Sequence, residues 1–197
     1  QRLRLPRPIR SAFDELMVQR VTCRNFDPIV ELSPGDLSTL LARSFGAQAI
    51  ESYGEAMDAV KKNSPSAGGL HPIEAYLLVN RVPGIVPGRY RYHAIDNALV
   101  PLDPGLPDVA TGQLLAGQQW FVDAPLLVFL VVRFRRNFWK YRGHAKAYRG
   151  VLLDAGDLAQ TFPLAATEQG LGAFVTAAIN EKDIECYLGL DPVESGV

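Results

Sequence analysis

The chain has 197 residues, 48% of them hydrophobic, and a formal net charge of −1, which fits one globular domain over residues 1–197. This balanced charge excludes the strongly positive field of a nucleic-acid-binding protein. The longest apolar run, Ala124 to Val132, is too short to span a bilayer. Two cysteines, Cys23 and Cys186, show no metal-ligand spacing, so we expect no metal site and a reducing, cytoplasmic setting.

Hydrophobic periodicity and capping residues predict an α+β domain with a mixed or antiparallel sheet covered by helices. Ser33, Pro34 and Gly46 give one helix a clear start and end. The predicted elements, in chain order, are helices Ser11–Gln19 and Ser33–Phe45, strands Ile73–Val79, Arg89–His93 and Ala98–Leu102, helix Pro107–Gln118, strand Leu126–Phe134, helix Ala145–Gln169, strand Ala173–Ala178 and a last helix from Glu181.

Two of these elements form the predicted centre of the fold. Leu126–Phe134 is apolar without alternation, which is typical of a fully buried central strand. Pro163 should kink the long helix, and Gly170 should end it. The residues expected to form one buried stripe along this helix are Tyr148, Val151, Leu152, Ala155, Leu158, Ala159, Phe162, Ala165 and Ala166.

The first polar cluster, Arg20-Val-Thr-Cys-Arg24, directly follows the first predicted helix. Arg20, Thr22 and Arg24 lie two residues apart, so their side chains point to one side of an extended segment. Two guanidinium groups that flank a hydroxyl suit a phosphate monoester, because each guanidinium is a planar fork of donors. Solvated charges at a helix end explain the same residues, and the pattern alone leaves both interpretations open.

The second cluster is the turn Ser64–Pro72, which leads into a predicted strand. Gly68 and Gly69 carry no Cβ, so the backbone there can approach a ligand closely. Ser64 and Ser66 add hydroxyl groups that can cap a short helix. Such a turn is most often only a turn, and its interpretation depends on the other clusters.

Two further clusters follow the predicted buried strand. In Trp139-Lys140-Tyr141-Arg142, a lysine beside a tyrosine can transfer a proton when it is partly desolvated, because burial lowers its pKa. Ordinary surface residues are the alternative interpretation. The small residues of Gly170–Ala178 either present backbone N–H groups to a flat ligand or permit close packing of a helix on a sheet.

In this order the four clusters resemble the nitroreductase family of flavin enzymes, from about Gln19 to Pro192. Arg20-Val-Thr-Cys-Arg-Asn-Phe26 is similar to the family's Arg-x-Ser-x-Arg-x-Phe element, which implies that Arg20, Thr22 and Arg24 hold the phosphate of FMN. The turn resembles the family's Pro-Ser-Ala-Gly turn along the isoalloxazine ring. The remaining residues that this resemblance places at the flavin are Pro65, Ser66, Gly68, Gly69, Leu70, Ala177 and Ala178.

More narrowly, the chain resembles the SagB-like dehydrogenases, which oxidise thiazolines and oxazolines in ribosomal peptides. Pro87-Gly-Arg-Tyr-Arg-Tyr92 is similar to a hairpin of that branch, and Lys140-Tyr141 matches its Lys-Tyr pair. The resemblance implies that Lys140 or Tyr141 takes a proton from the azoline ring while FMN accepts a hydride. Molecular oxygen is then the expected terminal acceptor.

The resemblance also implies a homodimer with FMN at the subunit interface, a modified peptide as substrate and a cyclodehydratase complex as a further partner. Neither nucleic acid nor a membrane is an expected partner. The alternatives are an NAD(P)H-dependent FMN reductase of dehydroamino acids, quinones or nitro compounds, and a non-catalytic family member that binds a peptide or another protein. Residues 1–10 are expected to form a flexible edge, and the family's C-terminal strand is expected to be missing after Val197.

Overall fold

The structure is a computed structural model that describes residues 2–52 and 58–197; Gln1, the first residue of the expected flexible edge, lies outside them. Its helices are α1 (Ala12–Gln19), α2 (Pro34–Phe45), α3 (Thr111–Leu114), α4 (Phe134–Tyr141), α5 (Lys146–Glu168) and α6 (Glu181–Leu188). Its strands are β1 (Ala47–Ser52), β2 (Asp58–Lys62), β3 (Ile73–Val79), β4 (Gly88–His93), β5 (Ala98–Pro101), β6 (Leu126–Arg133) and β7 (Ser195–Gly196). Two 3-10 turns, η1 (Ala67–Gly69) and η2 (Gln119–Phe121), complete the described elements.

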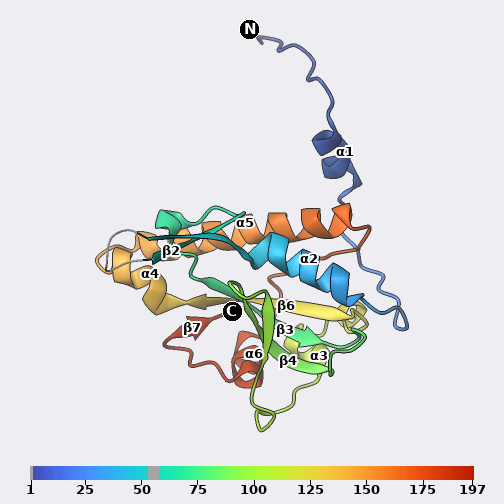
Figure 1. Ribbon diagram of the computed structural model, residues 1–197, viewed down its shortest axis with the longest axis vertical. Helices are drawn as coiled ribbons and strands as arrows, with labels where there is room; N and C mark the ends of the chain where they lie inside the picture. The colour runs from blue at the N-terminus through green and yellow to red at the C-terminus, as the bar shows by residue number, and fades with distance from the viewer. Residues whose placement is uncertain (1, 53–57) are drawn as a thin grey trace.

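The main sheet has five strands in the order β5-β4-β3-β6-β7, and every neighbouring pair is antiparallel. Strands β1 and β2 form a separate antiparallel hairpin. Figure 1 shows α2 and α5 above the main sheet and α6 below it. The expected α+β fold with an antiparallel sheet covered by helices is therefore confirmed, with β3 rather than β6 as the middle strand.

Alternation along β3 divides the core into two layers, because successive side chains of a strand point to opposite faces. Four residues of β3 pack with α2 and α5, and they are Ile73, Ala75, Leu77 and Val79. Tyr76 and Leu78 pack on the other face with residues of α6, including Ile184. Apart from Glu74, both faces of β3 are apolar, so the strand lies buried between two layers of helices.

Helix α2 begins and ends where its sequence predicts. The Ser33 hydroxyl accepts a hydrogen bond from the Asp36 N–H at 3.0 Å, and Pro34 occupies the first turn. At the other end Gly46 has an ordinary negative φ, but a Cβ there would lie 2.5 Å from the Ala42 carbonyl oxygen. Gly46 is therefore required by space rather than by backbone conformation.

Helix α5 differs from its expected bounds by one residue at each end and continues through Pro163 as one helix. Val151 and Leu158 are buried as predicted, but Tyr148 is 59% exposed and Leu152 is 73% exposed. Together with the exposed Leu153, these residues lie on the side of α5 that neither the sheet nor α2 covers in this chain. The prediction of one buried stripe was wrong for these positions, because it assigned every apolar residue of the helix to the core.

Two other elements differ from their predictions. The helix expected over Pro107–Gln118 is reduced to α3, because Ala116 and Gly117 both adopt positive φ angles and end it. The sequence did not predict β1, β2 or α4, although α4 contains Lys140 and Tyr141.

The amino-terminal segment lies apart from the sheet. Residues 2–10 are exposed and form neither helix nor strand, and α1 follows with Ser11 and Asp14 in a capping box. Figure 1 shows α1 above the carboxy-terminal end of α5. None of the described helices has the length and apolar composition that a membrane crossing needs, and both cysteines carry free thiols.

Candidate active site

The turn between β2 and β3 contains three residues with positive φ angles. Gly68, Gly69 and His71 have φ angles of 66°, 69° and 44°. A Cβ at Gly68 would lie 2.5 Å from the Tyr141 hydroxyl and 2.9 Å from Lys140 Nζ, whereas a Cβ at Gly69 would meet nothing within 4 Å. Gly68 is thus needed for both conformation and space, and Gly69 leaves an open backbone surface.

Asp154 of α5 fixes this turn from below. Its side chain is only 4% exposed and accepts hydrogen bonds from the Ser66 hydroxyl at 2.5 Å and from the Ala67 N–H at 2.8 Å. The Ser66 hydroxyl in turn accepts a hydrogen bond from the His71 N–H at 2.9 Å. It therefore holds the turn together, and the expectation that its hydroxyl caps a short helix was wrong. Sequence reasoning missed Asp154, although an acid three residues after Val151 in a buried stripe was a usable signal.

Lys140 and Tyr141 end α4 directly against the turn. Lys140 Nζ donates to the Gly68 carbonyl oxygen at 3.2 Å and lies 6.0 Å from the centre of the Tyr141 ring. Tyr141 is half-buried, but Lys140 is exposed. The partial burial that proton transfer by this lysine requires is therefore absent in a single chain. The second and third clusters of the sequence are nevertheless brought together at Gly68.

The first and fourth clusters also meet. The Cys23 N–H donates to the Ala173 carbonyl oxygen at 3.0 Å, and Thr22 forms an isolated parallel bridge with Ala173. The Arg24 guanidinium lies over the Phe174 ring, 5.1 Å from its centre. Among the described residues, neither Arg20 nor Arg24 has a hydrogen bond or ion pair through its side chain. Both cations are therefore available to an anion.

The prediction of a strand over Ala173–Ala178 was wrong. The structure has only one isolated bridge there, at Ala173. The Ala178 N–H bonds to the Thr176 hydroxyl at 3.0 Å, and the Ala178 carbonyl oxygen accepts from Gln118. Local side-chain hydrogen bonds of this kind compete with strand pairing. The N–H of Ala178 is thus engaged, while Ala177 is exposed.

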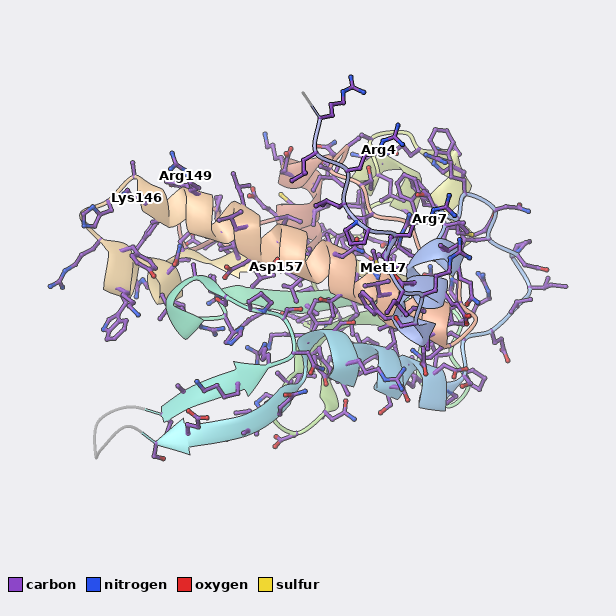
Figure 2. The ribbon with its side chains drawn as sticks, turned by 90° about the horizontal axis from the view of Figure 1, so that it is seen from above. Arg4, Arg7, Met17, Lys146, Arg149 and Asp157 are labelled. Carbon is purple, nitrogen blue, oxygen red and sulfur yellow. The ribbon has the colours of Figure 1, made fainter. Side chains whose placement is uncertain are left out.

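These two groups of residues lie at different positions along α5, one beside its amino-terminal half and the other beyond its carboxy-terminal end. The turn is bonded to Asp154, whereas Phe174 lies beyond Glu168, the last residue of the helix. At 1.5 Å per residue, the axis from Asp154 to Glu168 is about 21 Å long. Figure 2 shows Met17 of α1 at one end of α5 and Lys146 at the other. One chain therefore presents two separate parts of the predicted site.

A cluster of charged side chains lies beneath the turn. Lys62, Ser66, His71 and Asp154 are among the residues that line a cavity of about 10 Å³, which is close to the space one water molecule needs. Burial and, to a smaller extent, the positive charge of Arg136 lower the pKa of Lys62 to about 8, against a smaller opposing effect of Glu74. Burial and the Lys62 charge also lower the pKa of His71.

The low pKa of Lys62 predicts a pH-dependent stability. The unfolded lysine keeps a pKa near 10.5, so between pH 8 and 10.5 the unfolded state binds more protons and the wild type gains stability as pH rises. We expect Lys62→Met to be more stable than wild type at pH 7 by about 3 kcal/mol or less, and this difference to shrink above pH 8. Urea unfolding at pH 7 and pH 9.5 measures it; Lys61→Met, which removes an exposed lysine, is the control.

A larger cavity lies away from this chemistry. It has a volume of about 530 Å³ and lies on the α6 face of the sheet, where Tyr76, Arg91 and Arg133 contribute to its lining. None of the residues that line this cavity was predicted from the sequence to belong to a functional site. Its volume alone does not make it the active site, because volume says nothing about reactive groups.

The family model for nitroreductases matches residues 17–197, which is most of the chain. The chain belongs to the nitroreductase family. The nitroreductase-family chain therefore belongs to the oxidoreductases. It also has the nitroreductase-like fold.

Curated relatives of the nitroreductase-family chain include two that match over more than two thirds of its length. MJ1384 of Methanocaldococcus jannaschii is 28% identical over 151 residues, which are 75% of this chain and 73% of that protein. The trifolitoxin-processing protein TfxB of Rhizobium leguminosarum bv. trifolii is 30% identical over 148 residues, 70% of this chain and 38% of TfxB. The chain thus spans well under half the length of TfxB.

Solved structures share the fold. An Anabaena variabilis protein matches with a TM-score of 0.67 and 28% identity, over 82% of this chain and 33% of its own. The E. coli microcin synthetase McbBCD complex with truncated pro-MccB17 bound matches with a TM-score of 0.65 and 24% identity, over 87% and 63%. An Exiguobacterium sibiricum protein in complex with FMN matches with a TM-score of 0.58 and 11% identity, over 95% and 85%. The last two, below 25% identity, show the fold alone.

Proposed function

We propose that this chain is an FMN-dependent dehydrogenase that oxidises thiazoline or oxazoline rings in a ribosomally made peptide. The observation that carries the proposal is the contact at Gly68. There the Tyr141 hydroxyl and Lys140 Nζ fill the space that a Cβ would occupy, beside the open backbone of Gly69. A potential proton acceptor and a turn that can lie against a flat ring therefore adjoin each other.

The described residues fit FMN in two parts. Arg20, Thr22 and Arg24 would hold the phosphate, because two unpaired guanidinium groups suit a dianion. The isoalloxazine ring would lie along the residues of the turn and near the small residues after α5, namely Pro65, Ser66, Gly68, Gly69, Leu70, Ala177 and Ala178. When bound, FMN supplies the acceptor for the hydride that leaves the substrate.

A homodimer would join the two parts. The exposed side of α5 carries Tyr148, Leu152 and Leu153, and such an apolar face on a helix favours burial against another protein surface. If α5 packs against its copy about a two-fold axis, in antiparallel orientation, the turn of one subunit approaches Arg24 of the other. The separation of the two parts along α5 supports this arrangement.

The chain's own residues would supply orientation and proton transfer. Lys140 or Tyr141 would remove the proton from the ring carbon next to the one that loses hydride, and closure by the substrate would reduce the exposure of Lys140. Asp154 would keep Ser66 and Ala67 fixed, so that the turn needs little reorganisation on binding.

The relatives support the peptide as substrate. TfxB is named for trifolitoxin processing, and the McbBCD structure contains a truncated pro-peptide within a synthetase complex. The Exiguobacterium protein was solved with FMN. By analogy, we propose a modified peptide as substrate and a cyclodehydratase complex as partner for this chain.

We expect the purified protein to bind FMN, and Arg20→Ala and Arg24→Ala each to weaken this binding about tenfold or more, since each removes a charge-assisted contact. Titration of apoprotein with FMN, followed by flavin absorbance and fluorescence, measures the affinity. Arg7→Ala, an exposed arginine outside the proposed site, is the matched control.

Three outcomes distinguish the proposal from its rivals. Protein that takes up no FMN would contradict the proposal and would favour a non-catalytic binding partner. The observation that motivates this alternative is the Ala178 N–H, which is already bonded to Thr176. Rapid anaerobic bleaching of bound flavin by NADPH, without oxidation of azoline peptides, would favour a reductase of dehydroamino acids, quinones or nitro compounds. Oxidation of an azoline peptide under oxygen would support the dehydrogenase.

A further inference from the structure

Two segments that are far apart in the sequence lie side by side next to Arg24. Thr22 forms a parallel bridge with Ala173, and the Cys23 N–H donates to the Ala173 carbonyl oxygen at 3.0 Å. A Cβ at Gly172 would lie 2.7 Å from the Cys23 sulfur, so the absence of a side chain at this glycine lets the segments approach so closely. These backbone contacts determine which side chains meet where the two segments continue.

The contacts place the Arg24 guanidinium over the Phe174 ring. The guanidinium carbon lies 5.1 Å from the ring centre, which is within the range of a cation–π contact. Arg24 is exposed, and an exposed arginine without such a contact samples many rotamers. The ring of Phe174 therefore restricts a side chain that is proposed to bind an anion.

Phe174 is itself held by another aromatic ring. Its ring centre lies 4.2 Å from that of Phe121, which is only 5% exposed and belongs to the core on the α6 face of the sheet. Phe26 also contacts Phe121, with 6.5 Å between the ring centres. A phenylalanine has few rotatable bonds, so a packed ring is a rigid support. The rings thus connect Arg24 to the core.

Other arginines of this chain are held by carboxylates instead. Arg135 pairs with Glu194, and Arg136 pairs with Glu74. A carboxylate neutralises the guanidinium and occupies its donors, so it competes with any further anion. An aromatic ring carries no net charge and attracts the cation only through its quadrupole. A guanidinium that rests on a ring therefore keeps its full positive charge for a phosphate group.

We propose that Phe174 is a positioning residue that holds Arg24 in place for the phosphate of FMN. The inference rests on the proposed function, and it adds to that site a residue that the sequence did not assign to it. Phe174 would not touch the phosphate. It would reduce the rotamer freedom that Arg24 loses on binding, and this loss is part of the cost of binding a ligand. FMN should therefore bind more tightly than it would to a freely moving arginine.

Two flavins that differ only in the phosphate test this role. Riboflavin lacks the phosphate of FMN, so the ratio of the two affinities reports the phosphate contact. We expect Phe174→Leu, which removes the ring but keeps an apolar side chain, to weaken FMN binding about three- to tenfold, the factor for ordering one long side chain. Riboflavin affinity should stay close to that of wild type. Titration of apoprotein, followed by flavin fluorescence, measures both affinities.

Two further variants separate positioning from packing. Phe162→Leu is the matched control, because Phe162 is also half-buried and its ring packs against Phe45, in the core on the other face of the sheet. This change should leave the ratio of FMN to riboflavin affinity unchanged. Phe174→Tyr keeps an aromatic ring and should retain the wild-type ratio. Circular dichroism and thermal unfolding verify that all variants fold.

Combination with the arginine variants identifies the cation that Phe174 positions. In the Arg24→Ala background, Phe174→Leu should cause no further loss of the ratio, because the side chain that it positions is gone. In the Arg20→Ala background the same change should cause its full loss of about three- to tenfold, because Arg24 is still present.

Several results would overturn the proposal. Equal weakening of FMN and riboflavin by Phe174→Leu would mean that the ring only stabilises the fold. An unchanged ratio in Phe174→Leu, or a further loss in the Arg24→Ala background, would also reject the positioning role. The proposed function fails in a different way, because wild-type protein that binds neither flavin would reject the FMN site itself. If wild type binds FMN and only the Phe174 results are negative, the FMN site stands and the positioning role does not.

Discussion

Lys140→Met and Tyr141→Phe should each lower the rate of azoline oxidation by about 10²- to 10⁴-fold, the usual loss when a general base or acid is removed. Flavin content should stay close to that of wild type, because neither side chain has a bond to a residue proposed to hold the phosphate. Lys140 Nζ and the Tyr141 hydroxyl both lie at the position of a Gly68 Cβ, so the two groups act at one place. Single-turnover reduction of the flavin by substrate measures the proton-removal step directly.

Comparison of the two variants assigns the base. If Tyr141 takes the proton and Lys140 only assists it, Tyr141→Phe should lower the rate more than Lys140→Met does, because only the first change removes the accepting atom. Lys182→Met, on α6, is the control for loss of a lysine charge far from the turn. Full activity of both Lys140→Met and Tyr141→Phe on the true substrate would reject the proposed role.

Much of the fold was predictable because local signals and tertiary packing agree. Helix α2 has a Ser33 cap, Pro34 in its first turn and a steric stop at Gly46, and its bounds match the prediction. Strand β3 is apolar except for Glu74 because helices cover both of its faces, and its bounds are those expected. In both elements the apolar residues of the sequence are the buried residues of the structure, so the pattern was sufficient for prediction.

The errors arise where burial is weak or local geometry intervenes. Strands β1 and β2 are exposed or half-buried, so their sequences lack the alternation that identifies a strand. Helix α4 is short and rich in arginine, and it follows β6 without a turn, so no signal separates the two elements. Thr176 bonds locally and prevents the expected strand after α5.

The four clusters of the candidate site were predictable from the sequence. Their arrangement in two pairs, the second with the third and the first with the fourth, was not. Residue types and spacing identified Arg24 and Gly68 separately, since each chemical motif is local. Their placement at different positions along α5 depends on how the chain folds back on that helix, which no local pattern contains. Asp154 was missed for the same reason: its function is a contact with Ser66, 88 residues away in the chain.

A mixed dimer should recover flavin binding that two defective variants lack separately. Arg24→Glu damages the proposed phosphate part, and Gly68→Val damages the turn, where φ is 66° and Tyr141 occupies the space. If each site combines Arg24 of one subunit with Gly68 of the other, the mixed dimer contains one intact site and one doubly damaged site. Within either homodimer, both sites carry a defect.

Co-refolding equal amounts of the two variants should therefore restore about a quarter of the wild-type flavin, because about half of the dimers are mixed and each has one intact site of two. Retained flavin after gel filtration measures this recovery. Mixing Arg24→Glu with Arg20→Glu is the control: both defects fall in the same part of the site, so no combination of these subunits yields an intact site. Recovery in the control would mean that Arg20 and Arg24 of one chain do not belong to the same site. No recovery in the Arg24→Glu and Gly68→Val mixture despite heterodimer formation would mean that each chain builds its flavin site alone. The separation along α5 would then have to be closed by movement within one subunit rather than by its partner.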